Sequence, residues 1–400
     1  MFMDAKRIPR RKKRKNRAVF TGACKWGEFL KLLHLCSYYC GRPALYNNLF
    51  QALEAAGELR NEMYAPVHKG AGLDEIPKND KILISPCFDR WNRVFFHLKH
   101  RRILRDVQEK LEITAYDLLH AHTLFSNGYI ARRLHQKYGV PYTVTVQNTD
   151  IYTFFKKMPH LRTMGRKILN EASAVFFISA PHCEETLSKY VREADREAVR
   201  KKSYIVPLGV DDFWFRNPSA GKTLGGPPAF SVLYAGEITR NKNIPVLAEA
   251  VKLLNEKGRQ GRLTVVGNVV DPSEERRLLT YPFVTMHPRL PKEELLERYR
   301  ENDIFALVSK RETFGLVCAE AMTQGLPVLY TRGQGFDRQF PEGEIGFPVD
   351  CRRAEEIAEA MERVIQNYDE LSRRCVALCG KFEWKKVAAE YQTVFLSLKE

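Results

Sequence analysis

The chain has 400 residues, of which 44% are hydrophobic, and a formal net charge of +16. This length suffices for two domains with separate cores, and no apolar run is long enough to cross a bilayer. Residues 1–17 carry nine basic residues and one acid, a net +8, so half of the excess charge lies there. We expect residues 1–28 to be a basic flexible extension that lacks the apolar segment of a signal peptide.

The nine cysteines are odd in number and scattered along the chain, which is typical of a protein from a reducing cytoplasm. His34, Cys36 and Cys40 suggest zinc as an alternative. They fall in a predicted buried strand and its exit loop, however, and no second pair of cysteines completes a site. We therefore expect no metal ion.

The first predicted unit is a strand followed by a helix. Residues 31–36 have strand composition, and apolar residues at helical spacing run from Leu45 to Leu53 before Gly57 ends the helix. The loop between them contains Gly41 but lacks the GxGxxG spacing of a dinucleotide site. Residues 62–67 and 81–88 have the composition of the next strands.

The segment 91–110 is predicted as a basic helix. Trp91, Val94, Phe95 and Leu98 fall on one helical face, and Arg, Lys and His side chains crowd the remainder. Two interpretations stay open. A packed helix would turn its basic face to water, whereas an interfacial helix would hold the protein on anionic lipid.

Two polar loops follow neighbouring strands in the next part of the chain. Residues 117–121 form a predicted strand that leads to His122, and residues 142–146 form another that leads to Gln147 and Asp150. A helix over 126–138 separates them. Because ligands bind at the carboxyl ends of parallel strands, we expect both loops at one binding edge.

A second domain is predicted after a linker at residues 211–228, which are rich in Gly, Pro and polar residues. Its first strand, 230–235, leads through a loop to a helix that starts near Asn243. Lys242 would then lie beside the positive end of that helix, a position that suits a diphosphate. Further strands are expected at 263–267 and 283–286, and helices at 350–367 and 369–379.

The stretch from Ser309 to Tyr330 is predicted as a loop, a helix and a strand. Gly315 opens the helix, and the free amides of its first turn favour an anion such as phosphate. Glu312 lies before the helix and Glu320 lies within it, so the two carboxylates can reach different parts of one extended ligand. A capping box at Ser309 and Glu312 is the structural alternative.

This stretch resembles the donor-binding signature of the retaining family 4 glycosyltransferases. The resemblance rests on Glu312-x7-Glu320, the embedded Phe314-Gly315-Leu316 and the following Gly325-x-Pro327-Val328. It implies an α/β fold of the GT-B type, with two facing Rossmann-like domains of parallel sheets and a cleft between them. The implied domains are 29–210 on the acceptor side and 229–382 on the nucleotide-sugar side, with a helix at 383–400 that crosses back to the first.

The resemblance also implies roles for individual residues. Lys242 and Arg240 would stabilise the leaving diphosphate and Glu312 would hold sugar hydroxyls, while Glu320 would hold the ribose. The remaining donor-binding candidates are Phe314, Gly315, Leu316, Gly236, Gly267 and Arg289. The acceptor-side candidates are Gly41, His122, Gln147 and Asp150. No cofactor beyond the donor substrate is implied.

Two positions depart from the family pattern. Glu237 stands where the family commonly has arginine, and Gln147 stands where it often has histidine. A non-catalytic partner protein of the same fold therefore stays an alternative, as does an epimerase acting on a similar donor. Nucleic-acid binding through the basic residues 10–17 is a third, and we do not expect it.

The resulting prediction is an enzyme that moves a sugar, with retention, from a nucleoside diphosphate sugar to a glycan or lipid-linked acceptor. Its expected setting is the synthesis of cell-surface polysaccharide or glycoconjugate. The predicted location is cytoplasmic, with peripheral contact at the inner, anionic face of the membrane as a further alternative.

Overall fold

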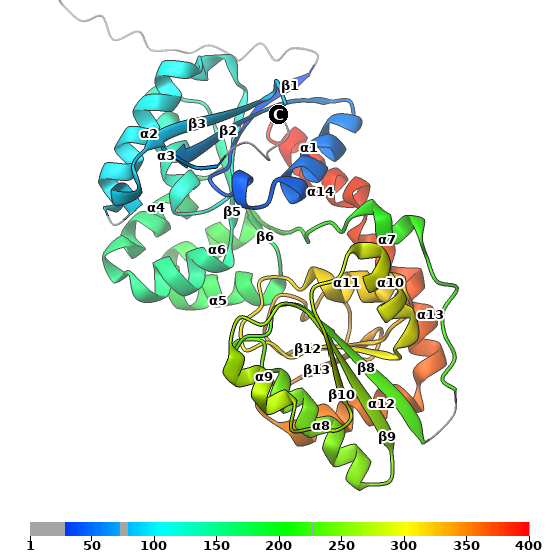
Figure 1. Ribbon diagram of the computed structural model, residues 1–400. Helices are drawn as coiled ribbons and strands as arrows, with labels where there is room; N and C mark the ends of the chain where they lie inside the picture. Colours follow the sequence, from blue (N-terminus) through cyan, green and yellow to red (C-terminus); the bar gives the residue numbers. More distant parts are fainter. Residues whose placement is uncertain (1–28, 73–78, 94, 226–227, 400) are drawn as a thin grey trace, which may run out of the picture.

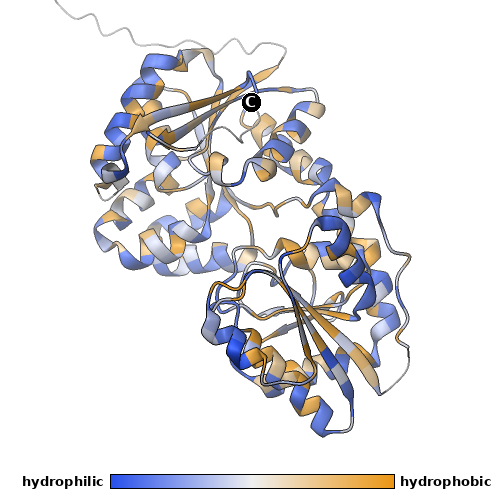
Figure 2. Ribbon diagram, viewed as in Figure 1, coloured by the Kyte–Doolittle hydropathy of each residue, from blue (hydrophilic) through white to orange (hydrophobic). Residues whose placement is uncertain are grey.

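The computed structural model describes residues 29–72, 79–93, 95–225 and 228–399. They form two domains, each built around a parallel sheet covered by helices (Figure 1). The predicted basic extension at 1–28 lies outside the described residues. Figure 2 shows hydrophobic strands at the centre of each domain and hydrophilic outer helix surfaces, the arrangement expected where both faces of a parallel sheet are covered.

The first domain contains a seven-stranded sheet in the order β3-β2-β1-β4-β5-β6-β7. Most residues of its central strands are buried, because helices pack on both faces of the sheet. The strands are β1 (Leu30–Leu35), β2 (Leu59–His68), β3 (Ile82–Phe88), β4 (Leu118–Ala121), β5 (Tyr142–Val146), β6 (Ala174–Phe177) and β7 (Ser203–Ile205). The helices are α1 (Pro43–Ala55), α2 (Phe96–Lys110), α3 (Ser126–Tyr138), α4 (Arg162–Glu171), α5 (Ala180–Tyr190) and α6 (Glu193–Lys201).

The second domain contains a six-stranded sheet in the order β10-β9-β8-β11-β12-β13. The strands are β8 (Ala229–Ala235), β9 (Gln260–Val266), β10 (Val284–His287), β11 (Ile304–Leu307), β12 (Val328–Thr331) and β13 (Gly346–Val349). The helices are α8 (Ile244–Glu256), α9 (Pro272–Leu278), α10 (Lys292–Glu301), α11 (Leu316–Thr323), α12 (Ala354–Gln366) and α13 (Tyr368–Leu378). The α/β class with two Rossmann-like domains is thus confirmed.

Two chain segments cross between the domains side by side. Val210 forms an isolated parallel bridge with Glu383, and its amide donates to the Phe382 carbonyl oxygen at 2.9 Å. The Trp384 indole lies on Gly209, where an added Cβ would approach the ring to 2.3 Å. The last helix, α14 (Trp384–Ser397), then returns to the first domain and packs beside α1 (Figure 1).

The segment expected to be a linker, 211–228, contains a short helix, α7 (Asp212–Arg216). Its Trp214 is buried in the core of the second domain, against Tyr299. Farther along, the Lys222 amide donates to Ser372 Oγ at 2.7 Å. The described part of 211–228 therefore packs on the second domain, and the first crossing between the domains lies just before it.

Helix α2 differs from the helix predicted over 91–110. A 3-10 turn at 90–93 precedes it, and the helix buries His100, Ile103 and Val107. The face predicted to pack is open to solvent instead, because Trp91 is 82% exposed, Phe95 63% and Leu98 44%. Val94 lies outside the described residues. Helix α2 is thus packed with its arginines exposed to water, as one of the two interpretations expects, but the apolar face that was predicted to pack is the wrong one.

Candidate active site

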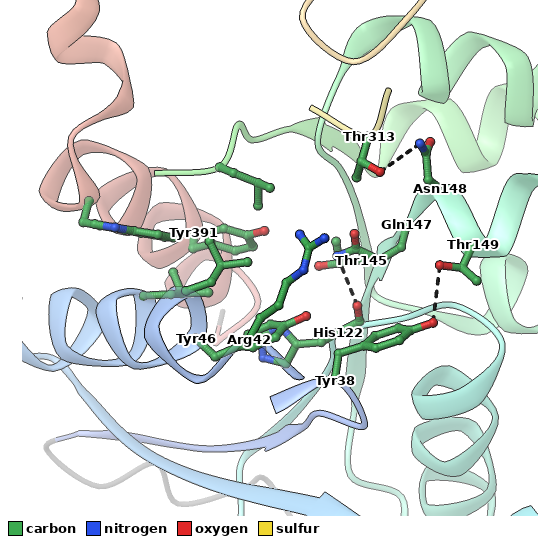
Figure 3. A pocket seen from close by; sticks show the side chains of 14 residues that line it. Tyr38, Arg42, Tyr46, His122, Thr145, Gln147, Asn148, Thr149, Thr313 and Tyr391 are labelled. Carbon is green, nitrogen blue, oxygen red and sulfur yellow. Dashed lines mark hydrogen bonds between the residues drawn. The ribbon is translucent and has the colours of Figure 1, made fainter. Parts of the chain in front are cut away.

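The carboxyl ends of the two sheets face each other across a cleft. The Asn148 side-chain amide, after β5, donates to Thr313 Oγ1 at 3.0 Å, which joins the domains directly. A cavity of about 140 Å³ lies beside this contact (Figure 3). Its lining comes from the loops after β1 and β4, strand β5 and the loop after it, α1, the crossing segment, the Thr313 loop and α14: Tyr38, Arg42, Leu45, Tyr46, Leu49, His122, Thr145, Gln147, Asn148, Thr149, Leu208, Thr313, Trp384 and Tyr391.

The second-domain wall of the cleft contains the start of α11. Gly315 precedes the helix with φ +91°, a conformation that favours glycine, and an added Cβ would lie 2.9 Å from Leu307. No described group accepts from the Leu316 and Val317 amides, as expected for the first turn of a helix. The Phe314 side chain packs against Phe336 and Phe382, so this residue offers the site only its backbone.

Glu312 and Lys242 form an ion pair at the mouth of this turn. Lys242 Nζ lies 2.7 Å from Glu312 Oε2, and both side chains are largely buried. Glu312 also accepts from the Ser309 hydroxyl and the Thr313 amide, so no capping box forms. Because an ammonium group has three donors, Lys242 keeps donors for a second anion. Parallel strands β8 and β11 are neighbours, which explains why these two predicted residues meet.

Arg240 is held at a different place from the one expected. Its Nε lies 2.9 Å from Asp271 Oδ2 at the start of α9, and its side chain is 75% exposed. Arg240, which was predicted to stabilise the leaving diphosphate together with Lys242, is therefore bound to Asp271 in this structure. The cause is the bridge between Ile238 and Val269, which places the loop before α9 beside Arg240.

Glu320 lies on α11, with its Oε2 accepting from the Tyr299 hydroxyl at 3.2 Å. Its other carboxylate oxygen has no hydrogen-bond partner among the residues that the structure describes. Burial raises the pKa of the Glu320 carboxyl to about 7. A hydroxyl donor at this oxygen would favour the ionised form.

The loops after β8, β9 and β10 meet at the far end of the same wall. Gly267 has φ +155°, and a Cβ there would lie 1.8 Å from the Gly236 carbonyl oxygen, so the two loops touch through bare backbone. Arg289 follows β10, with its amide 3.4 Å from Asn268 Oδ1 and its side chain exposed. These three predicted donor residues thus share one edge of the sheet.

A second glycine loop supports Glu312 and was not singled out from the sequence. The Glu312 amide donates to Gln334 Oε1 at 2.9 Å, and a Cβ at Gly335 would lie 2.2 Å from the Thr313 carbonyl oxygen. Positive φ at Gly333 marks the turn. Gly333 and Gly335 are the features of the sequence from which this loop could have been predicted.

On the first-domain wall, two of the predicted residues line the cavity. Gln147 donates through Nε2 to the His122 carbonyl oxygen at 3.4 Å, which ties the loops after β4 and β5 together. The other two do not line it. Gly41 ends the turn before α1, and Asp150 is buried, accepting from the amides of Leu124, Phe125 and Gln147. Burial raises the pKa of Asp150 to about 6 against these bonds.

Three buried histidines lie behind this wall: His34, His120 and His122. His34 Nδ1 lies 3.0 Å from His122 Nε2, His34 Nε2 lies 3.1 Å from Asn61 Oδ1, and His120 contacts Thr143 and Thr145. Burial lowers the pKa of His34 to about 4 and the pKa values of the other two well below the usual range. The cluster is therefore neutral at pH 7 and bonded within the protein.

Arg42 and Asn148 line the cavity, and the buried His182 lies within electrostatic reach of Glu312. The sequence drew no attention to these three residues. His182 is buried at the start of α5, with Nδ1 2.9 Å from Ser179 Oγ and Nε2 without a partner among the described atoms. Burial lowers the pKa of this imidazole to about 4. Only the position of Asn148 at the end of a strand was a signal.

Two family models match the chain, one in each domain. The model described as Glycosyltransferase Family 4 matches residues 48–212, and the model described as Glycosyl transferases group 1 matches residues 226–377. Together they take in both walls of the cleft, including the Lys242–Glu312 pair and α11.

Curated relatives and solved structures agree with these matches. D-inositol 3-phosphate glycosyltransferase of Paenarthrobacter aurescens is 27% identical over 68% of this chain and 71% of the relative, and that of Pseudarthrobacter chlorophenolicus is 30% identical over 65% and 64%. Among solved structures, the lipopolysaccharide outer core galactosyltransferase WaaB (16% identity, TM-score 0.70) and Anabaena HepE with UDP-glucose (16%, 0.65) each cover 92% of this chain and at least 99% of their own. The chain therefore belongs to glycosyltransferase family 4, has the GT-B fold and is a glycosyltransferase.

Proposed function

We propose that the chain transfers a hexose, with retention of anomeric configuration and without a metal ion, from a nucleoside diphosphate sugar. The observation that carries the proposal is the Lys242–Glu312 pair beside the free amides of α11, next to the cavity between the domains. HepE is known with UDP-glucose, which makes UDP-glucose the first donor to test. The acceptor would bind mainly to the first domain.

In this mechanism the sugar C1–O bond to the diphosphate breaks while the acceptor oxygen bonds to C1 from the same face. The acceptor proton passes to the released phosphate oxygen. Lys242 and the amides of Leu316 and Val317 would stabilise the charge that develops on the diphosphate. Glu312 would hold the sugar hydroxyls, with Gly236, Gly267 and Arg289 around the nucleoside.

A nucleotide-sugar panel in excess EDTA tests this function. A donor present at a hundred times its dissociation constant should stabilise the protein by about 2.7 kcal/mol in thermal unfolding. Transfer to an acceptor should then proceed at full rate with the chelator. Activity restored only by Mg²⁺ or Mn²⁺ would refute the metal-free mechanism. Donor turnover without any acceptor would favour an epimerase, and no stabilisation by any donor would favour a non-catalytic partner protein.

We further propose that the Glu320 carboxylate accepts from the ribose hydroxyls. Glu320→Gln should weaken nucleoside diphosphate binding by about 1–3 kcal/mol, the usual contribution of a hydrogen bond to a charged group. Since binding would require the ionised carboxyl, nucleotide-sugar affinity of the wild type should rise from about pH 6 to about pH 8, through its pKa of about 7. The affinity of the variant should stay flat. Calorimetric titration at several pH values measures both effects, and unchanged affinity would place the ribose elsewhere.

We also propose that the protein works at the anionic inner face of a membrane, on a glycan or lipid-linked acceptor in polysaccharide or glycoconjugate synthesis. None of the described helices has the length and apolarity needed to span a bilayer. Exposed Phe95 and Leu98 instead line an apolar groove together with Met158 and Leu161. Trp91, shortly before Phe95 in the chain, is also exposed, as are Lys156 and Lys157 just before Met158. Exposed aromatic and basic side chains together suit a lipid headgroup layer.

Vesicle sedimentation checks this surface. We expect binding to anionic but not neutral vesicles, weakened by high salt and by the double change Trp91→Ala, Phe95→Ser. Leu279→Ser is the matched control, because Leu279 is equally exposed on the second domain, at 67%, and should not matter. If the wild type bound neither anionic nor neutral vesicles, this surface would not be a membrane-binding surface.

A further inference from the structure

Arg42 extends into the cavity between the domains (Figure 3). It lies between the turn after β1 and the first residue of α1, and its backbone amide donates to the Tyr39 carbonyl oxygen at 3.1 Å. The backbone is therefore fixed, while the guanidinium reaches toward the side of the cavity where Thr145 and Gln147 lie. A cation is thus placed where an acceptor would bind.

The Arg42 guanidinium has no ion-pair or hydrogen-bond partner within the described ranges of the chain, and no ring lies under it. Three other cations at the domain boundary are occupied. Lys242 pairs with Glu312, Arg338 pairs with Glu184 across the cleft, and Arg311 lies over the Tyr152 ring. Arg42 is therefore a cation of this boundary that has no partner among the described residues.

The rest of the cavity lining is neutral. It contains no carboxylate, and its one histidine, His122, is uncharged at pH 7 because burial lowers its pKa. Asp150, which follows the lining residue Thr149, does not line the cavity, and its oxygens accept from three backbone amides. The lining thus carries a net positive charge, and the Tyr38, Thr149 and Gln147 side chains add polar groups around it.

We infer that the acceptor carries an anionic group, a phosphate or a carboxylate, and that Arg42 binds it. This inference rests on the proposed function, since it concerns the acceptor of the same transfer. A planar guanidinium binds phosphate or carboxylate through two parallel hydrogen bonds, which fixes orientation as well as position. Because Thr313 adjoins both the cavity and Glu312, an acceptor anchored at Arg42 lies beside the donor wall. Arg42 is thus a specificity-determining residue for the acceptor.

The donor diphosphate is the other anion that Arg42 can meet, and the experiment separates the two. Inorganic phosphate is titrated into protein saturated with UDP, or with whichever nucleoside diphosphate binds best, so that the donor phosphate site is already filled. We expect phosphate to bind in the millimolar range and Arg42→Gln to weaken it at least fivefold. Arg42→Lys should keep part of the affinity, and UDP affinity should stay within about twofold in both variants.

Arg101→Gln is the matched control, because Arg101 is an exposed arginine of α2 and its loss should leave phosphate binding unchanged. Equal phosphate affinity in wild type and Arg42→Gln, or no phosphate binding at all, would overturn the inference. A parallel loss of UDP affinity would assign Arg42 to the donor instead. If no nucleotide binds the wild type, the proposed function fails, while phosphate titration of the free protein still decides on Arg42.

A kinetic arm uses matched acceptors, D-glucose 6-phosphate against D-glucose and D-inositol 3-phosphate against inositol, with UDP-glucose as donor. If the protein uses either pair as acceptors, it should prefer the phosphorylated member of that pair. Arg42→Gln should then raise the KM for the phosphorylated acceptor more than about tenfold, while kcat stays within about threefold. Equal use of the neutral members by the wild type would contradict an anion site.

Discussion

Lys242→Ala should lower kcat by about 10²–10³, with a smaller effect on donor KM. The reason is that the negative charge on the diphosphate, which Lys242 stabilises, develops mainly in the transition state. The ion pair with Glu312 adds a second cost. Removing the ammonium leaves a largely buried carboxylate uncompensated beside the incoming diphosphate, and like charges there repel. Adding Glu312→Gln to Lys242→Ala should therefore restore part of the donor affinity, and a double-mutant cycle gives the coupling.

Arg240→Ala is the control for this experiment. Arg240 is an equally basic residue of the same loop, but its guanidinium is exposed and bound to Asp271, so its loss should reduce kcat less. Steady-state kinetics with saturating acceptor separates the two parameters. A near-normal kcat in Lys242→Ala would show that this loop does not stabilise the charge of the leaving group.

Gly335→Ala should lower kcat/KM by about 10²-fold without unfolding the protein. A Cβ at this position would lie 2.2 Å from the Thr313 carbonyl oxygen and 2.5 Å from the Phe314 Cα, both backbone atoms. The 312–315 loop must then shift, and with it the Glu312 carboxylate and the start of α11. Displacing groups aligned for reaction by about 1 Å typically costs that factor.

Gly333→Ala is the matched control for the collision. Gly333 lies in the same turn with φ +75°, and an added Cβ there meets nothing within 4 Å. Its replacement carries only the backbone strain of the left-handed region, about 1–2 kcal/mol. If the two variants lost activity equally, strain in the turn rather than displacement of Glu312 would explain the effect.

The sequence predicted what depends on local pattern and on parallel topology. Residues 126–138 and 142–146 form α3 and β5 as predicted, and Lys242 meets Glu312 because neighbouring parallel strands end at one edge. Contacts between the domains carry no such pattern, which is why the Asn148–Thr313 bond and the position of Arg42 were not foreseen. Arg240 was misplaced because its partner, Asp271, comes from a different loop.

Helical periodicity also misled at residues 91–110. A pattern of apolar residues reports which side chains share a face, but not whether that face meets the core or the surroundings. Here the buried face is the one with Ile103 and Val107, and the face with Phe95 and Leu98 is open. The same holds for polar residues, because a carboxylate at the end of a strand does not have to face the binding site. Asp150 accepts hydrogen bonds from backbone amides and does not line the cavity.

The return of α14 makes synthesis order matter for this protein. One face of the first sheet, at Leu32, Leu118 and Phe176, is covered by Trp384, Tyr391, Phe395 and their neighbours on the last helix. While the chain emerges from the ribosome, the part of that apolar face that α14 covers stays exposed until residues 384–397 have been made. A nascent chain stalled before α14 should therefore bind chaperones through a domain whose strands are already complete.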